Sequence, residues 1–146
     1  MAAATTAEHL PALEEIRLLK ALYCRYADAR QWDEFQRLFT VDVRLRFLDV
    51  QGNLTAEILA PSLAETLTER VGTGQPVHHV FSHEIYLDSP DEARAVWSME
   101  DYVFPADAGE KTRRGFGQYH ETYRRTSDGW RFVTVEVSRL RLEFID

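Results

Sequence analysis

The second half of the sequence alternates between apolar and polar residues over four long stretches, and this feature constrains the fold more than any other. The stretches cover residues 78–88, 93–104, 111–125 and 130–144, and a repeat of two residues is typical of β-strands. Short segments rich in Asp, Ser, Gly and Pro separate them, which predicts turns between antiparallel neighbours. A sheet of this size needs cover for its apolar face, and the first half of the chain must supply it.

Helical spacing of apolar residues dominates that first half. Asp33 and Gln36 form the pattern of a capping box at the start of a short second helix, and Pro61 should bend or split the third. The predicted elements are helices over 11–27, 34–39 and 55–71 and a strand over 41–48.

The order helix, helix, strand, helix and four strands predicts an α+β domain. We expect a curved, cone-shaped sheet of antiparallel or mixed strands packed against three helices. A length of 146 residues fits one domain over 1–146, with residues 1–8 frayed. A cone with a single opening suits a small ligand.

Charge and hydropathy narrow the possible partners. The formal net charge of −7 differs from the basic balance of nucleic-acid-binding proteins, and no basic run could bind anionic lipid. The apolar stretches are shorter than the roughly 20 residues that cross a bilayer, and we expect no signal peptide. Cys24 is the single cysteine, so no internal disulfide can form. These features predict a cytoplasmic protein that binds neither nucleic acid nor membrane.

Alternation also predicts which side chains of 78–88 face the interior. One face carries His79, Phe81 and His83 with two further apolar residues, so this face should point inward and His78 outward. The two inward histidines are separated by about 13 Å of extended chain, which is too far for one metal ion to bridge. We therefore predict no metal site.

Two acidic residues occupy unusual positions. Asp101 shares an apolar face with Trp97 and Met99, and a carboxyl in such surroundings is paired, protonated or functional. Asp28 lies near the C-terminal end of the first predicted helix, where the helix dipole disfavours negative charge. A functional site is one explanation for both positions.

The orientation of two further side chains depends on strand register. His120 lies in a stretch with aromatic residues on both faces, so it can point either way. Arg139 follows a row of alternating valines and shares their face unless a β-bulge resets the register.

Tyr, Asp, His and Arg side chains around apolar walls suit proton transfer on a small organic molecule. An imidazole, with an ordinary pKa of about 6.5, can accept a proton at neutral pH, and a phenol can donate to an oxygen that gains charge. The sequence has no Gly-rich phosphate loop, no Gly-x-Ser-x-Gly motif and no cysteine pair for zinc. Structural roles stay open: His79 and Tyr23 can be core residues, and Arg139 can pair with a surface acid.

Several motifs spread over nearly the whole chain carry a family resemblance. They are 16–39 with its run from Tyr23 to Asp28, the pair His78 and His79, 97–101, 115–123, 128–130 and 138–141. In these motifs the sequence resembles the SnoaL-like family of the nuclear transport factor 2-like superfamily, which implies the cone fold. The resemblance is nearest to the branch with scytalone dehydratase and bile acid 7α-dehydratase, enzymes that eliminate water from a ring bearing a carbonyl without metal or cofactor.

The resemblance also implies roles for individual residues. Asp28 matches the aspartate at the end of the first helix, Tyr23 a tyrosine of the pocket, and His79 the histidine of the strand. Asp101 matches an acidic residue in the pocket of the bile acid enzyme. Arg139 or Arg141 matches an arginine that comes late in the family's sequence. Two positions depart from scytalone dehydratase: its second histidine falls near residues 115–117, which lack one, and its tyrosine before the aspartate is Ala27. We therefore expect a different substrate.

The prediction is a cofactor-free acid–base enzyme that acts on a small apolar ring compound, steroid-like or polyketide-like, as a dehydratase. The predicted catalytic residues are His79, Asp28, Tyr23 and Asp101. The predicted substrate-binding residues are Tyr26, Phe47, Phe81, Trp97, Met99, His120 and Arg139. The alternatives are a double-bond isomerase of the ketosteroid isomerase type, a non-catalytic binding or assembly module, and the small subunit of a ring-hydroxylating oxygenase.

Self-association is the expected protein–protein interaction. We expect a homodimer or homotrimer formed through the outer face of the sheet, where Tyr86, Val96, Tyr102 and Phe104 should point outward.

Overall fold

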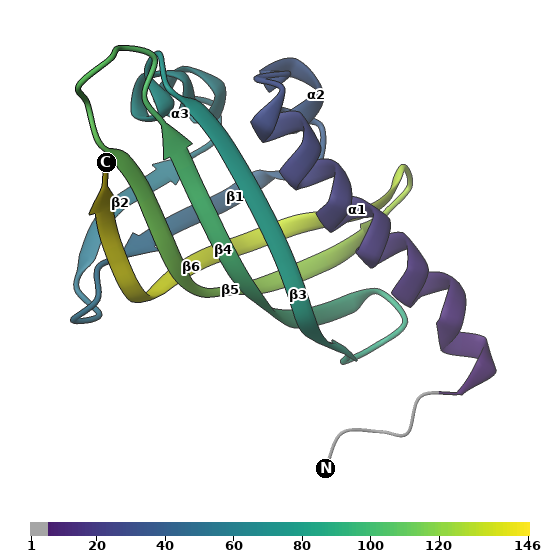
Figure 1. The fold of residues 1–146 in the computed structure, drawn as a ribbon. Coiled ribbons are helices and arrows are strands. Elements are labelled where there is room, and N and C mark those ends of the chain that lie inside the picture. Colours follow the sequence, from purple (N-terminus) through teal and green to yellow (C-terminus); the bar gives the residue numbers. More distant parts are fainter. Residues whose placement is uncertain (1–5) are drawn as a thin grey trace.

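Six strands form one curved sheet in the computed structural model, which describes residues 6–146. The strands are β1 (Phe39–Leu48), β2 (Leu54–Leu59), β3 (Gln75–Leu87), β4 (Glu92–Phe104), β5 (Thr112–Thr126) and β6 (Gly129–Ile145). Figure 1 shows their order across the sheet, β2-β1-β6-β5-β4-β3. β1 and β6 run parallel, and the other neighbours run antiparallel, so the sheet is mixed and is not closed into a barrel.

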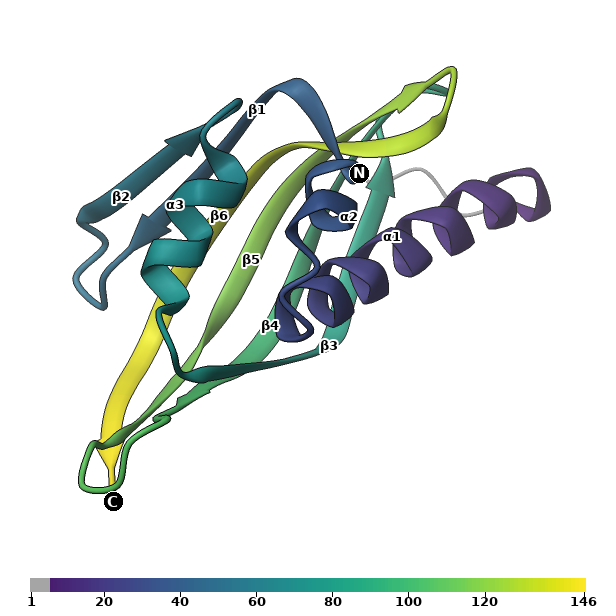
Figure 2. The same cartoon turned by 90° about the horizontal axis from the view of Figure 1, so that it is seen from above.

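Three helices cover the concave face of this sheet. They are α1 (Leu10–Asp28), α2 (Trp32–Gln36) and α3 (Leu63–Val71), and a short 3-10 turn, Ala7–His9, precedes α1. Viewed from above, α1 lies beside β3 and α3 lies near β1 and β2 (Figure 2). The predicted α+β class, with three helices against a cone-like sheet, is confirmed. In the part of the chain that the structure describes, none of the helices has the length and hydropathy needed to cross a membrane.

Aromatic side chains fill the space between α1 and the sheet. The ring of Tyr23 lies 4.9 Å from that of Phe35, 5.4 Å from Phe132 and 5.6 Å from Tyr119, measured between centroids. All four rings are buried, and each such pair adds about 0.5–1.5 kcal/mol beyond the burial of its area. The cluster fixes the last turns of α1, including Asp28, against the sheet.

The predicted helix over 55–71 is wrong in its first half. Leu54–Leu59 is strand β2, which pairs with β1 in a hairpin. The carboxylate of Asp49 accepts hydrogen bonds from two amides of the turn, and Gly52 has a φ of 85°, a conformation that glycine adopts at little cost. Pairing with β1 buries Ile58, and this tertiary contact outweighs the local helical spacing.

Two smaller expectations concern helix starts. Asp33 does not cap α2, because Gln31 occupies the N-cap position and Asp33 lies in the first turn. Of residues 1–8, expected to be frayed, 1–5 lie outside the described residues, whereas Ala7 and Glu8 belong to the 3-10 turn.

A β-bulge divides β3 into two parts. Ser82 has a φ of 47°, and the pairing of β3 with β4 shifts between Phe81 and Glu84. An extra residue at such a point exchanges the faces on which later side chains lie. The alternation of β3 therefore holds within each part but not across the bulge.

The bulge makes the predicted orientation wrong for the first part of β3. His78 pairs with an inward residue of β4 and lies at the interior cavity, whereas Phe81 is 49% exposed and lies, like His79, on the opposite face. After the bulge His83 points inward as predicted, and its ring lies 4.8 Å from a buried indole.

Candidate functional site

A cavity of about 90 Å³ lies between the helices and the concave face of the sheet. Its apolar walls include Trp32, Phe35, Phe47, Leu67 and Val103. Its polar lining consists of Tyr23, Tyr119, His78, Asp101, Arg70, Arg113 and Arg139. An apolar cavity with a few convergent polar groups is typical of a ligand-binding site.

His78 and Asp28 form a pair at the edge of this cavity. The carboxylate of Asp28 lies 2.6 Å from His78 Nδ1 and also accepts a hydrogen bond of 3.1 Å from the His78 amide. Asp28 is the last residue of α1, so these contacts offset the unfavourable helix dipole at that end. Because Nδ1 is engaged by the carboxylate, Nε2 is the ring nitrogen left for a bound molecule.

The predicted pairing of Asp28 with His79 is therefore incorrect. The neighbouring histidine takes that position because the bulge at Ser82 reverses the expected faces of residues 78–81. His79 pairs across the strands with Glu100 on the outer face.

Asp101 and Arg139 form the second charged pair of the site. Arg139 donates two parallel hydrogen bonds to the carboxylate, of 2.6 and 2.8 Å, and this forked geometry is among the strongest ion-pair arrangements. Burial by itself raises the pKa of Asp101, but the hydrogen bonds and charge of Arg139, with the charge of Arg113, lower it below its ordinary value. Gly115 leaves room for the pair, since a Cβ there would lie 2.4 Å from the carboxylate.

Two tyrosines contribute neutral hydroxyl groups to the cavity lining. Burial is the main cause that raises the pKa of Tyr23, and the charge of Glu121 adds to it. Burial also raises the pKa of Tyr119. Both phenols are therefore protonated at neutral pH, and they can act as hydrogen-bond donors but not as bases.

The predicted substrate-binding residues divide into three groups. Phe47 and Arg139 line the cavity. Trp97 and Met99 are buried in the core beneath it, where the indole of Trp97 donates a hydrogen bond to Tyr123. Tyr26, Phe81 and His120 are not among the cavity-lining residues.

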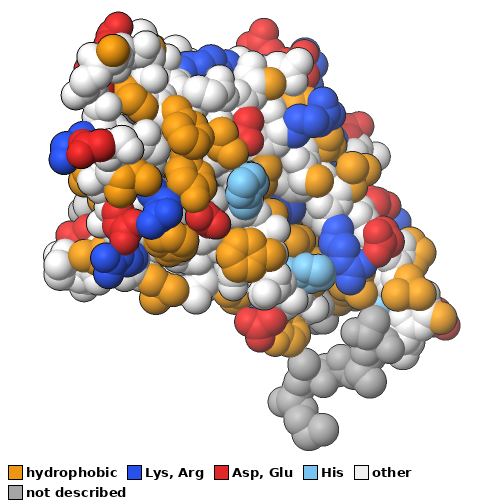
Figure 3. Space-filling model, viewed as in Figure 1, with side chains coloured by type: hydrophobic (Ala, Val, Ile, Leu, Met, Phe, Trp, Pro, Cys, Tyr) orange, Lys and Arg blue, Asp and Glu red, His pale blue; other side chains and the backbone are white. Residues whose placement is uncertain are grey.

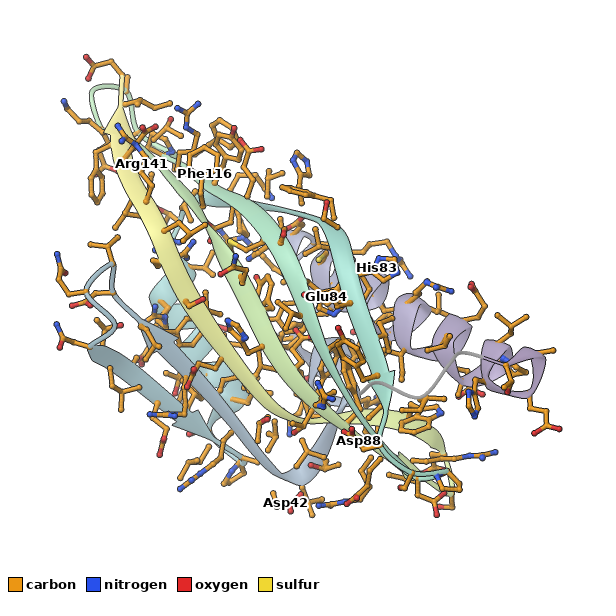
Figure 4. The ribbon with its side chains drawn as sticks, turned by 90° about the horizontal axis from the view of Figure 1, so that it is seen from below. Asp42, His83, Glu84, Asp88, Phe116 and Arg141 are labelled. Atoms are coloured by element: carbon orange, nitrogen blue, oxygen red, sulfur yellow. The ribbon has the colours of Figure 1, made fainter. Side chains whose placement is uncertain are left out.

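Strand register settles the orientation of His120. It pairs with Val96 and Glu136 on the outer face, and its ring lies 3.2 Å from the hydroxyl of Ser138. The outer face also carries Glu84 and Phe116, which lie on the side of the sheet away from the helices (Figure 4). The predicted role of His120 in the interior site is therefore incorrect.

Among the lining residues that the sequence did not predict, five carry a polar side-chain group. They are His78, Trp32, Arg70, Arg113 and Tyr119. Gly115 offers a signal only for the pair Asp101 and Arg139, which lie against it, because glycine within a strand often marks a close approach of other groups. Among residues 6–146, no cluster of three or more His, Cys, Asp and Glu side chains has the arrangement of a metal site.

A wider hollow of about 490 Å³ lies on the outer face. Two of its three arginines have close partners: Arg46 bonds to Glu136 at 2.8 Å, and Arg94 bonds to Asp88 at 3.1 Å. The interior cavity, with its histidine–carboxylate pair, is therefore the better candidate for an active site.

Comparisons with known proteins agree with this fold. A protein of Gibberella zeae named "Probable cyclase FGR4" is 28% identical over 133 residues, covering 86% of this chain and 89% of that protein. The Kfla4162 protein of Kribbella flavida has a TM-score of 0.81 at 24% identity and covers 91% of this chain and 93% of its own. A Novosphingobium aromaticivorans protein described as a "Putative Scytalone Dehydratase" has a TM-score of 0.83 at 19% identity, and the match covers 97% of this chain and 93% of that protein.

Hexachlorocyclohexane dehydrochlorinase LinA-type3 of Novosphingobium barchaimii has a TM-score of 0.78 at 14% identity, with coverage of 94% and 92%. At these identities, the similar structures show the fold alone. The family model of the SnoaL-like domain matches residues 8–136. Since this match covers most of the sequence, the chain belongs to the SnoaL-like family.

Proposed function

We propose that this protein is an acid–base enzyme that removes water from a small, largely apolar ring compound bearing a carbonyl group. The observation that carries the proposal is the 2.6 Å contact between His78 Nδ1 and the Asp28 carboxylate at an apolar cavity. A carboxylate in this position fixes the imidazole tautomer and stabilises the imidazolium that forms when Nε2 accepts a proton. Proton transfers suffice for the reaction, so no cofactor is required.

In the proposed reaction, His78 Nε2 accepts a proton from the carbon next to the carbonyl. The electron pair of the broken C–H bond forms an enolate, which then expels the hydroxyl group from the adjacent carbon. The imidazolium returns its proton to the departing hydroxyl, which leaves as water. A positioned acid–base group of this kind contributes about 10²–10⁴-fold to a rate.

Tyr23 and Tyr119 have a supporting role in this proposal. A neutral phenol can donate a hydrogen bond to the carbonyl oxygen as negative charge develops there. Asp101 is held by two hydrogen bonds from Arg139, so it organises the charge of the site and does not act as a free base.

Two other functions are compatible with the same pair. In an isomerase, His78 would return the proton to a different carbon, and the product would keep the mass of the substrate. In a binding module, the cavity would hold an apolar ligand without turnover.

A panel of cyclic β-hydroxy ketones, analysed by mass spectrometry, tests the proposed function. We expect products that have lost water, and we expect His78→Ala and Asp28→Asn to reduce the rate by about 10²-fold or more. His79→Ala is the matched control, because it removes the adjacent histidine from the other face of β3 and should keep the wild-type rate. Full activity of folded His78→Ala would exclude the proposed base, and products of unchanged mass would favour the isomerase.

A further inference from the structure

Positive charge is concentrated at the cavity of an otherwise acidic chain. The chain has a net charge of −7, yet Arg70, Arg113 and Arg139 all line the cavity, where Asp101 is the one carboxylate in the lining. Within residues 6–146, the nearby carboxylate of Asp28 is already engaged by the histidine. The cavity lining therefore carries more guanidinium groups than carboxylates.

Arg113 has free hydrogen-bonding capacity in this group. Its Nη2 lies 3.8 Å from Asp101 Oδ2, which is beyond hydrogen-bonding distance, whereas Arg139 binds both carboxylate oxygens. The Arg113 side chain is 35% exposed. Burial lowers its pKa, although Asp101 acts in the opposite direction. A ligand anion could accept hydrogen bonds from this guanidinium without breaking the existing pair.

Arg70 lies at the mouth of the same cavity, in the last turn of α3. Its guanidinium stands over the ring of Phe47, 4.3 Å from the centroid. Burial lowers its pKa first, followed by the positive charges of Arg113 and Arg139. The three arginines are therefore close enough to repel one another, and a bound anion would relieve this repulsion.

We propose that Arg113 and Arg70 form a subsite for the carboxylate of a flat, otherwise apolar substrate. The fork of a guanidinium matches the two oxygens of a carboxylate, and the aromatic walls of the cavity suit the apolar body attached to it. A neutral ligand would leave the donors of Arg113 unpaired and the positive charge uncompensated. This subsite deepens the proposed function and rests on it, because the carboxylate anchors the molecule whose C–H bond meets His78.

Calorimetric titration with three probes tests the subsite at 0.15 M salt. The probes are benzoate, its neutral counterpart benzamide, and inorganic phosphate. We expect the wild-type protein to bind benzoate at least about tenfold more tightly than benzamide, as a charge-assisted hydrogen bond implies. Phosphate should bind more weakly than benzoate because it lacks the apolar body.

Variants of two arginines separate the subsite from general attraction of anions. Arg113→Gln should bring the benzoate-to-benzamide ratio close to one, and Arg113→Lys, which keeps the charge but not the fork, should give an intermediate ratio. Arg44→Gln is the control, since Arg44 also lies 3.8 Å from its acidic partner but is 59% exposed and belongs to the outer hollow. A thermal melt of each variant shows that the protein is folded.

Each result decides for or against the subsite. Equal binding of benzoate and benzamide, an unchanged ratio in Arg113→Gln or Arg113→Lys, or an equal loss in Arg44→Gln would overturn it. Phosphate binding as tight as benzoate would replace the carboxylate subsite with a general anion site. His78→Ala should keep the benzoate preference, so a failure of the proposed reaction and a failure of the subsite give different results.

Discussion

Lys20 and Glu121 form an ion pair that is fully removed from solvent, and its loss should strongly destabilise the fold. The Lys20 ammonium contacts the Glu121 carboxylate, and neither side chain is exposed. The ammonium also lies 3.3 Å from the ring centroid of Tyr119 and 4.0 Å from that of Tyr23. The second oxygen of Glu121 accepts a hydrogen bond from Tyr123. The ammonium and the carboxylate thus have no water to stabilise them and depend on each other and on the neighbouring tyrosines.

Lys20→Met is the sharpest perturbation of this pair. Methionine fills a similar volume without charge, so the variant leaves a carboxylate alone in the core, which costs about 3–5 kcal/mol. The double variant Lys20→Met with Glu121→Gln removes both charges and keeps an acceptor for Tyr123. Because replacing both partners of a buried ion pair is often close to neutral, we expect the double variant to recover at least about 2 kcal/mol of that loss.

Urea unfolding followed by tryptophan fluorescence measures these differences. The exposed pair Asp42 and Arg124, 3.4 Å apart, provides the control, and Arg124→Ala should cost less than about 1 kcal/mol. A cost of Lys20→Met below that of the exposed control, or a double variant no more stable than the single one, would refute this reasoning.

Three further predictions concern pH and assembly. Burial raises the pKa of Cys24 to about 11 from 9.0. The contribution of this thiol to stability is therefore complete below pH 9 and is lost as pH rises through the folded value. Cys24→Ala should flatten the dependence of the unfolding free energy on pH in that window, and the native thiol should resist a thiol reagent at pH 8. The pKa of Asp101 is lowered from 3.8, so the contribution of its carboxylate to stability is present above pH 3.8 and is lost as pH falls below it. Asp101→Asn should make the unfolding free energy less sensitive to pH below pH 4. An unchanged sensitivity would contradict this assignment. A homodimer or homotrimer remains our prediction. Phe104, 42% exposed, stacks on Tyr102 at the end of β4, and Figure 3 shows apolar side chains exposed over the sheet. Phe104→Glu should therefore lower the mass measured by light scattering.

The extent of the strands could be predicted because their alternation is mostly regular. In β4, the inward positions of Trp97, Met99 and Asp101 follow from an uninterrupted repeat of two. β2 was misassigned because its six residues are too few for periodicity to separate strand from helix. Pairing with β1, a contact absent from any local pattern, decides its structure.

The site was harder to predict than the fold because it depends on register between distant strands. Asp28 could be identified from its unfavourable place at a helix end, and Asp101 from its apolar neighbours. Arg113 gives no comparable local signal, because a charged residue near a strand end is ordinary on a solvent face. Its position becomes meaningful only when β4 and β5 pair and bring it within 3.8 Å of Asp101.

The bulge at Ser82 explains why His79 was predicted in place of His78, and it also positions the proposed base of the site. In a regular strand, residues five positions apart point to opposite faces, so His78 and His83 could not both point inward. The extra residue permits both. His78 reaches Asp28, while His83, which is exposed, packs against the buried Trp97 and accepts a hydrogen bond from Arg17 of α1, beside which it lies in Figure 4. One part of β3 therefore carries the proposed base, and the other attaches the same strand to the helix that ends in the carboxylate. Both members of the proposed catalytic pair are thus positioned by one interface, that between α1 and β3.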